Sequence, residues 1–133
     1  MTGWTYFEHT GRCYKFDPKQ TSWTDAIKSC QSATSNPSVN LASVPDKRTN
    51  DFLATVATQL SWIGGYRIPE GWAWLDGTDW NFTNWYTATG EPNNYQGLNE
   101  NYVMTNFIGK VGFWADYPDS IYPIGAICQY TPN

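Results

Sequence analysis

A long stretch without periodicity, from Asp76 to about Asn101, most constrains what this chain can fold into. The stretch is rich in Asn, Gly, Thr and Trp, and its apolar residues recur at neither helical nor strand spacing. Loops of this length are uncommon inside compact domains, and those that occur are usually functional. We therefore expect one domain that carries a long functional loop between regular elements.

Regular elements are indicated on both sides of this loop. Residues 4–16 are typical of a hairpin that turns at Gly11. Two helices are expected, the first capped by Ser22 or Thr24 and the second opened by Pro45-Asp46. Their apolar residues recur at helical spacing: Trp23, Ala26, Ile27 and Cys30 in the first helix, and Phe52, Leu53 and Val56 in the second.

The remaining apolar segments are short and predict strands. The expected strands cover residues 41–44, 62–65, 72–75, 102–108, 110–114 and 126–130. Two helices followed by mostly antiparallel strands define an α+β fold. No internal repeat or low-complexity linker interrupts the pattern, so residues 1–133 are expected to form a single domain.

The composition favours a loop-rich, secreted domain over a helical cytosolic protein. Aromatic residues make up 17% of the 133 residues, with eight Trp and nine Tyr. The formal net charge of −4, without a basic cluster, argues against nucleic acid or an anionic membrane as the main partner. No apolar run approaches the roughly 20 residues that span a bilayer, so we expect no membrane insertion.

Three clusters of oxygen-bearing side chains lie in and after the loop: Glu91-Pro92-Asn93, Asn99-Glu100-Asn101 and Trp114-Ala115-Asp116. Calcium takes about six to eight oxygen ligands from carboxylates, amides and backbone carbonyls. Four side chains could supply part of such a shell if the fold brings the clusters together: Glu91, Asn93, Glu100 and Asp116. The alternative is that these side chains are solvated or make local turns.

Further motifs surround these clusters in a fixed order. They are Gly3-Trp4 to Phe7, Cys13 to Phe16, Trp23 to Cys30, Trp62-Ile63-Gly64-Gly65, Trp72 to Gly77 with Phe82 and Trp85, and Gly125 to Cys128. In this order and at these intervals, the chain resembles the C-type lectin-like domain over essentially its whole length. The resemblance implies that family's fold, with two helices, mostly antiparallel strands and a long loop that binds calcium and sugar.

The resemblance also implies a calcium-dependent carbohydrate site of the mannose type. Glu91, Asn93, Glu100 and Asp116 match the family's metal and sugar ligands, and a cis Glu91–Pro92 peptide would turn both flanking side chains toward one ion. The Glu-then-Asn order implies mannose, glucose, N-acetylglucosamine or fucose, which offer vicinal equatorial hydroxyls. Tyr95, in the loop beside these residues, could pack on a sugar face or be a solvent-exposed spacer. Glycans or glycoproteins are the expected partners, and several copies of the domain would give avidity.

Two departures from the family pattern weaken this expectation. Ala115 stands where an Asn normally supplies a metal ligand and a hydrogen-bond donor, so we expect a weakened site. At the family's accessory calcium site, Arg67 intrudes, Asn94 and Asn101 replace acids, and only Glu70 is a plausible ligand. The alternative is therefore a C-type lectin-like domain that has lost sugar binding and recognises protein or serves as a scaffold.

The three cysteines leave at least one thiol unpaired within the chain. The resemblance implies a disulfide between Cys30 and Cys128. In the family, the partner of Cys13 comes just before the Gly3-Trp4 pair, a place that falls ahead of Met1. We therefore expect Cys13 to be a free thiol near the surface. The implied disulfide suits a secreted protein or the ectodomain of a larger one.

Catalysis has little support in the sequence. The single histidine, His9, lies far from the acidic clusters, and no nucleophile–base pair or phosphate-binding glycine loop is present. Glu91 and Asp116 could in principle form a glycosidase pair, but the interleaved amides and proline favour ligands. We expect a binding protein and not an enzyme. Asn81-Phe82-Thr83 is an N-glycosylation sequon, which makes Asn81 a candidate glycosylation site.

Overall fold

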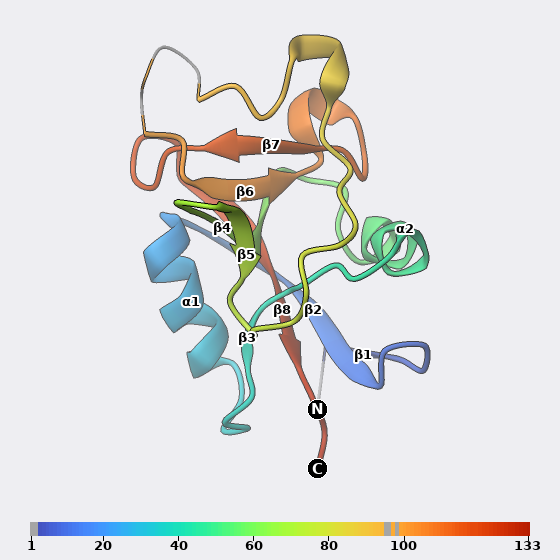
Figure 1. Cartoon of the computed structure of the whole chain (residues 1–133). Coiled ribbons are helices and arrows are strands. Elements are labelled where there is room, and N and C mark those ends of the chain that lie inside the picture. The colour runs from blue at the N-terminus through green and yellow to red at the C-terminus, as the bar shows by residue number, and fades with distance from the viewer. Residues whose placement is uncertain (1–2, 95–96, 98) are drawn as a thin grey trace.

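Two helices and one eight-stranded sheet build the fold in this computed structural model, which describes residues 3–94, 97 and 99–133 (Figure 1). The helices are α1 (Trp23–Ser32) and α2 (Lys47–Val56), and η1 (Thr87–Thr89) and η3 (Phe107–Gly109) are short 3-10 turns. The strands are β1 (Thr5–Phe7), β2 (Arg12–Thr21), β3 (Asn40–Leu41), β4 (Ser61–Ile68), β5 (Gly71–Trp74), β6 (Tyr102–Thr105), β7 (Trp114–Tyr117) and β8 (Ile124–Tyr130). The α+β expectation is confirmed.

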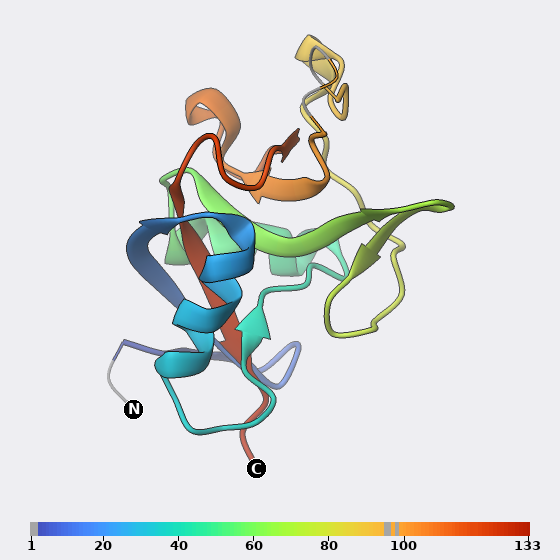
Figure 2. The ribbon, with the colours of Figure 1, turned by 90° about the vertical axis from the view of Figure 1, so that its left-hand side faces the viewer.

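The sheet is mixed, and the last strand lies in its middle. The strand order is β1-β2-β8-β4-β6-β7, with β3 added to β8 and β5 added to β4. All neighbours pair antiparallel except β4 and β8, which run parallel. Strand β7 is an edge of the sheet. The loop that follows β5 first runs toward β3, and its later part, which contains η1, lies beyond β6 and β7, at the opposite end of the molecule from β1 and the C-terminus (Figures 1 and 2).

Side-chain caps fix where both helices begin. The Ser22 hydroxyl accepts a hydrogen bond from the Asp25 amide at 3.2 Å, and the Asp46 carboxylate accepts one from the Thr49 amide at 2.8 Å. Each cap satisfies a backbone donor that the helix itself cannot, which is worth about 1 kcal/mol. Of the two candidate caps for the first helix, Ser22 is the one used. Of the three apolar residues expected on the inner face of the second helix, Leu53 is the one that is buried.

Three of the expected strands are wrong in extent, and one of them, 102–108, ends at Thr105. The segment 41–44 pairs as a strand only at Leu41, because Ala42 instead bridges two strands, donating to Ile127 and accepting from Gly64. The second strand of the last hairpin is 114–117 and not 110–114. Residues 107–113 turn instead, with Asn106 in the left-handed region (φ 64°) and its side-chain oxygen bonded to the Gly112 amide at 2.8 Å.

The disulfide between Cys30 and Cys128 is confirmed and joins α1 to β8, with 5.6 Å between the Cα atoms. A crosslink that closes a loop of this size stabilises a fold by about 4–5 kcal/mol in the chain-entropy model. Cys13 is free, as expected, but it is buried and not near the surface. It lies in β2 between Tyr6 of β1 and Tyr130 of β8, and its side chain belongs to a buried core cluster.

Tryptophans pack beneath the long loop and do not form an open platform. The rings of Trp74, Trp80 and Trp85 each contact Trp114, with centroids 5.6 to 5.9 Å apart. Trp114 is fully buried, and its indole nitrogen donates to Asn50 at 3.0 Å. The loop therefore rests on an aromatic core that fixes its course between β5 and β6.

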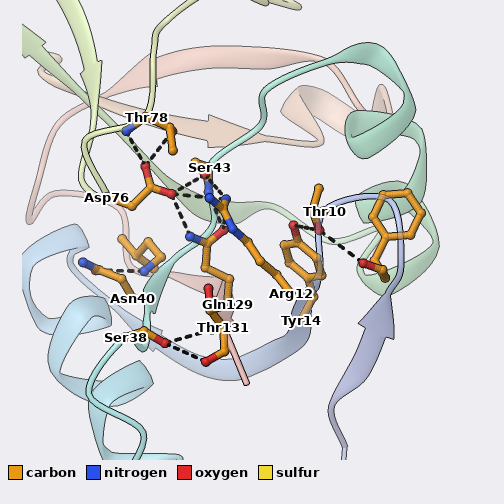
Figure 3. Close-up of polar contacts among 12 residues, drawn as sticks. Thr10, Arg12, Tyr14, Ser38, Asn40, Ser43, Asp76, Thr78, Gln129 and Thr131 are labelled. Carbon is orange, nitrogen blue, oxygen red and sulfur yellow. Dashed lines mark hydrogen bonds and ion pairs between the residues drawn. The ribbon is translucent and has the colours of Figure 1, made fainter. Parts of the chain in front are cut away.

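A polar network ties the start of the same loop to the sheet (Figure 3). Asp76 follows β5, and its Oδ2 accepts hydrogen bonds from Ser43 and from Gln129, the latter at 2.9 Å. Arg12 Nη1 lies 3.2 Å from the same oxygen and donates to the Ser43 hydroxyl at 2.7 Å. Arg12 and Asp76 each expose less than a fifth of their side-chain surface, so the network that holds the loop to the sheet is shielded from water.

Candidate functional site

A pocket of about 360 Å³ opens beside β7, where the long loop returns to the sheet. Its size falls within the usual range for small-molecule sites. Five of its lining residues are polar and are called the polar side here: Thr89, Glu91, Asn93, Glu100 and Asp116. The other three are aromatic and are called the aromatic side: Phe107, Tyr117 and Tyr122. All four side chains expected to bind metal and sugar therefore line one pocket.

Glu91 is held at the polar side with its carboxylate turned toward its neighbours. The Glu91–Pro92 peptide is cis, as the resemblance implied. Glu91 Oε2 accepts hydrogen bonds from the Thr89 hydroxyl at 2.9 Å and from Asn93 Nδ2 at 3.1 Å. The acceptor of Glu91 and the donor of Asn93 thus lie close enough for one ligand group to meet both.

Negative charge is concentrated around Glu91. Burial, a hydrogen bond with Asp116, and the negative charges of Asp116 and Glu100 raise the pKa of Glu91 to about 7. Only 7% of Glu91 and 5% of Glu100 is exposed, so water screens these charges poorly. A positive group entering the pocket would relieve this repulsion.

Asp116 fastens the Glu-Pro-Asn turn to the sheet. Its side chain is completely buried. Oδ1 accepts a hydrogen bond from the Asn93 amide at 3.0 Å, and Oδ2 accepts one from the Asn94 amide at 2.8 Å. Charge-assisted bonds of this kind are stronger than neutral ones, so Asp116 sets the position of Asn93.

Arg67 supplies a fixed positive charge next to Asp116. From β4, its Nη2 donates to Asp116 Oδ2 at 2.9 Å and to the Glu100 carbonyl at 3.0 Å. Its guanidinium carbon lies 4.3 Å from the centre of the Trp72 ring, where a planar cation is favoured. Its backbone amide donates to the Asn101 carbonyl at 2.7 Å. Arg67 thereby braces the returning end of the loop.

Asn94 and Ala115 stand where the family pattern has metal ligands, but here both have structural roles. The Asn94 side-chain oxygen accepts from the Glu100 amide at 2.8 Å, which braces the loop. Ala115 is fully buried in a core cluster with Trp62 and Met104 and supplies no side-chain oxygen.

Asn81 of the glycosylation sequon is exposed. Tyr95, expected to pack on a sugar, lies outside the described residues.

The donor set fits a divalent cation by charge and by atom type. The three carboxylates of Glu91, Glu100 and Asp116 against the guanidinium of Arg67 leave a net charge of −2 when all four are ionised. Oxygen donors are those that calcium prefers. Among residues 3–94, 97 and 99–133, however, no three acidic, His or Cys side chains already form a metal-binding group. A full shell would need amide, backbone or ligand oxygens as well.

The aromatic side of the pocket was not predicted. Tyr117 directly follows Asp116, so its sequence position could have pointed to the pocket. Phe107 and Tyr122 come from a 3-10 turn and from the segment between β7 and β8, and no motif marked them. Their convergence depends on the sheet edge that β7 forms.

Comparison with known proteins finds one matching family model and several similar proteins. Residues 19–130 match the family model of the Lectin C-type domain. Rat C-type lectin domain family 10 member A is 36% identical over 95 residues, which cover 69% of this chain and only 29% of that protein. The galactose-specific lectin nattectin of Thalassophryne nattereri is 32% identical over 120 residues, covering 84% of this chain and 69% of its own length.

Solved structures share the fold over nearly the whole chain. The cow C-type carbohydrate-recognition domain of CD23, solved with a GlcNAc2Man3 oligosaccharide, superposes with a TM-score of 0.82 at 26% identity, covering 100% of this chain and 96% of that one. A Ca2+-dependent type II antifreeze protein in its Ca2+-free form gives 0.81 at 31% identity, covering 98% and 99%.

Proposed function

The chain belongs to the C-type lectin domain family, and on that premise we propose that it binds carbohydrate at the pocket beside β7, with calcium and a mannose-type preference. The observation that carries the proposal is the convergence of Glu91, Asn93, Glu100 and Asp116 on one pocket. These four residues would hold the ion. When bound, calcium supplies direct coordination of two neighbouring sugar hydroxyls.

The polar side chains would orient the sugar through their donors and acceptors. An ionised carboxylate only accepts hydrogen bonds, whereas an amide nitrogen donates them. Glu91 Oε2 and Asn93 Nδ2 already lie 3.1 Å apart. One hydroxyl lying beside this pair, within hydrogen-bond distance of both atoms, would donate its proton to Glu91 and accept from Asn93. Glu100 would accept from the neighbouring hydroxyl, which supports a ligand with vicinal hydroxyls.

Asp116 would act by positioning and not by touching the sugar. Its carboxylate is buried and bonded to the amides of Asn93 and Asn94 and to Arg67. It therefore keeps the Asn93 backbone in place before any ligand arrives. Such preorganisation lowers the ordering cost of binding.

The mannose preference depends on the order of acceptor and donor in the turn. Exchanging them in the double variant Glu91→Gln and Asn93→Asp should move binding from mannose-type to galactose-type glycans. A glycan array read with calcium and again with chelator tests both sugar class and calcium dependence. Glu8→Gln, which removes an exposed carboxylate from the N-terminal hairpin turn, is the matched control and should keep the wild-type pattern.

A protein-recognition or scaffold domain without sugar binding is the second candidate. The observation in its favour is the combination of Ala115, which offers no side-chain oxygen, with Arg67, whose charge already pairs with Asp116. An array that is blank with calcium, together with unfolding midpoints that calcium leaves unchanged, would favour this second candidate.

An extracellular setting fits the proposed activity. The Cys30–Cys128 disulfide persists in oxidising compartments. Among the described residues, no helix has both the length and the apolar character to cross a bilayer. Asn81 is exposed and open to glycosylation in a eukaryotic secretory pathway. We propose a secreted protein or an ectodomain that binds glycans or glycoproteins without catalysis and gains avidity from several copies.

A further inference from the structure

The aromatic side of the pocket is continuous with the polar side along β7. Asp116 faces the Glu-Pro-Asn turn, and Tyr117, the next residue, lines the same pocket. Asp116 and Tyr117 are successive residues of the edge strand, and both line this one pocket. A ligand bound by the carboxylates would therefore meet the rings directly.

The aromatic side has a fixed base and an exposed outer ring. Tyr117 is half-buried and packs edge-on against the core residue Trp62, with ring centroids 5.9 Å apart. Tyr122 lies against Tyr117, with 5.2 Å between the centroids and 34° between the planes. Tyr122 is 47% exposed and its neighbour Ile121 is 52% exposed. An apolar surface with a solvent-facing ring is thus held beside the polar half of the pocket.

The chemistry of the two halves defines the class of ligand. Glu91, Glu100 and Asp116 disfavour an anionic ligand, and they fit neutral hydroxyl groups or a cation. The rings of Phe107, Tyr117 and Tyr122 offer no charge and favour an apolar or aromatic group. A simple hexose would satisfy the polar half and leave the aromatic side facing water.

Resting on the carbohydrate-binding function proposed above, we propose that the pocket prefers glycosides that carry an aryl aglycone, which packs on Tyr122 and Tyr117. The sugar hydroxyls occupy the polar half, and the aglycone covers the exposed ring of Tyr122. Aromatic pairs contribute enough beyond simple burial to change affinity by about three- to tenfold.

The test compares p-nitrophenyl α-mannoside with methyl α-mannoside by calorimetry in calcium. Wild-type protein should bind the aryl glycoside about three to ten times more tightly than the methyl glycoside. In Tyr122→Ala, the ratio of the two affinities should fall to near one, whereas Tyr122→Phe keeps the ring and should keep the ratio. Tyr6→Ala, which removes a 56% exposed tyrosine from β1, is the matched control and should also keep it.

Three other results would each overturn the inference, and they can be told apart. Equal affinities of wild type for the two glycosides would remove the aryl preference and leave the carbohydrate function standing. A preference that survives in Tyr122→Ala would place the aryl group elsewhere. Absence of binding to either glycoside, in calcium, would overturn the inference together with the proposed function on which it rests.

Discussion

Arg67 on β4 and Asp116 on β7 form an ion pair across the sheet, with 2.9 Å between Nη2 and Oδ2. Strand β6 lies between the two strands. The Asp116 side chain is wholly buried, while 35% of the Arg67 side chain is exposed. A fixed guanidinium therefore lies beside a pocket whose charged lining groups are carboxylates. It neutralises part of their charge and holds the loop to the sheet.

Removing this guanidinium should weaken the fold and increase its need for calcium. Arg67→Gln takes away the charged donor of Asp116, and hydrogen bonds to charged groups are worth about 1.5–3 kcal/mol. The net charge of the site changes from −2 to −3, so calcium should restore more stability in the variant than in wild type. Thermal unfolding with millimolar calcium and with chelator measures both effects. Lys28→Gln, whose side chain is 81% exposed, is the control, and similar behaviour of the two variants would contradict the assigned role.

Calcium should stabilise the wild-type protein. Glu91, Glu100 and Asp116 repel one another, and a bound cation removes that repulsion in the folded state alone. A ligand at 100 times its dissociation constant adds about 2.7 kcal/mol to the free energy of unfolding. Unfolding midpoints measured across a calcium series should rise steadily. Magnesium at the same concentrations controls for ionic strength, and an equal rise with both ions would argue against a specific site.

The Cys13 thiol should react only when the protein opens. It is 8% exposed and belongs to a buried core cluster, whereas Cys30 and Cys128 are joined in a disulfide. A thiol reagent should therefore label no cysteine in the native protein and one cysteine per chain in denaturant without reductant. Mass mapping identifies the labelled residue. Rapid labelling of the native protein would mean that Cys13 is accessible.

Acid should weaken the contact between the N-terminal hairpin and α2. Burial tends to raise the pKa of Asp46, but hydrogen bonds from His9 and Thr49 outweigh it and lower the pKa from 3.8 to about 2. A carboxyl whose pKa is lowered by folding contributes stability above its unfolded value, and that contribution is lost as pH falls toward the folded value. Stability from Asp46 should therefore disappear between about pH 4 and pH 2.

Urea unfolding at a series of pH values checks this contribution. Asp46→Asn keeps a helix-capping side chain but cannot titrate, so its free energy of unfolding should fall less steeply over the same pH range. Asp51→Asn on the same helix is the matched control, since Asp51 is exposed and pairs with the exposed Lys47 side chain. Parallel curves for wild type and Asp46→Asn would refute the assignment.

Much of the fold could be predicted because the residues that specify each helix or strand lie close together in the sequence. The helix that begins after Ser22 has its cap, its apolar spacing and its disulfide cysteine within ten residues. The hairpin after β6 was misplaced because its turn depends on Asn106, whose side chain reaches Gly112 and the carbonyl of Ala57. Such a contact between distant segments leaves no periodic signal in the sequence.

Four of the residues on the polar side of the pocket could be picked out from the sequence, but their surroundings could not. Glu91, Asn93, Glu100 and Asp116 stand in motifs that resemble a known family, and they line one pocket. The sequence placed Arg67 at the family's accessory calcium site. Its contacts with Asp116 and with the carbonyl of Glu100 could not be predicted, because they depend on the pairing of β4 and β6. Tyr122 reaches the pocket only through the path of the chain after β7.

The most direct test of the central claim is a calorimetric titration of methyl α-mannoside into the protein, first with millimolar calcium and then with chelator. We expect saturable binding with calcium, no binding with chelator, and loss of binding in Glu91→Gln, whereas Glu8→Gln binds as wild type does. Binding that is unchanged by chelator, or that survives in Glu91→Gln, would contradict a calcium-dependent sugar site at this pocket. Absence of binding under both conditions would contradict carbohydrate recognition of the mannose type.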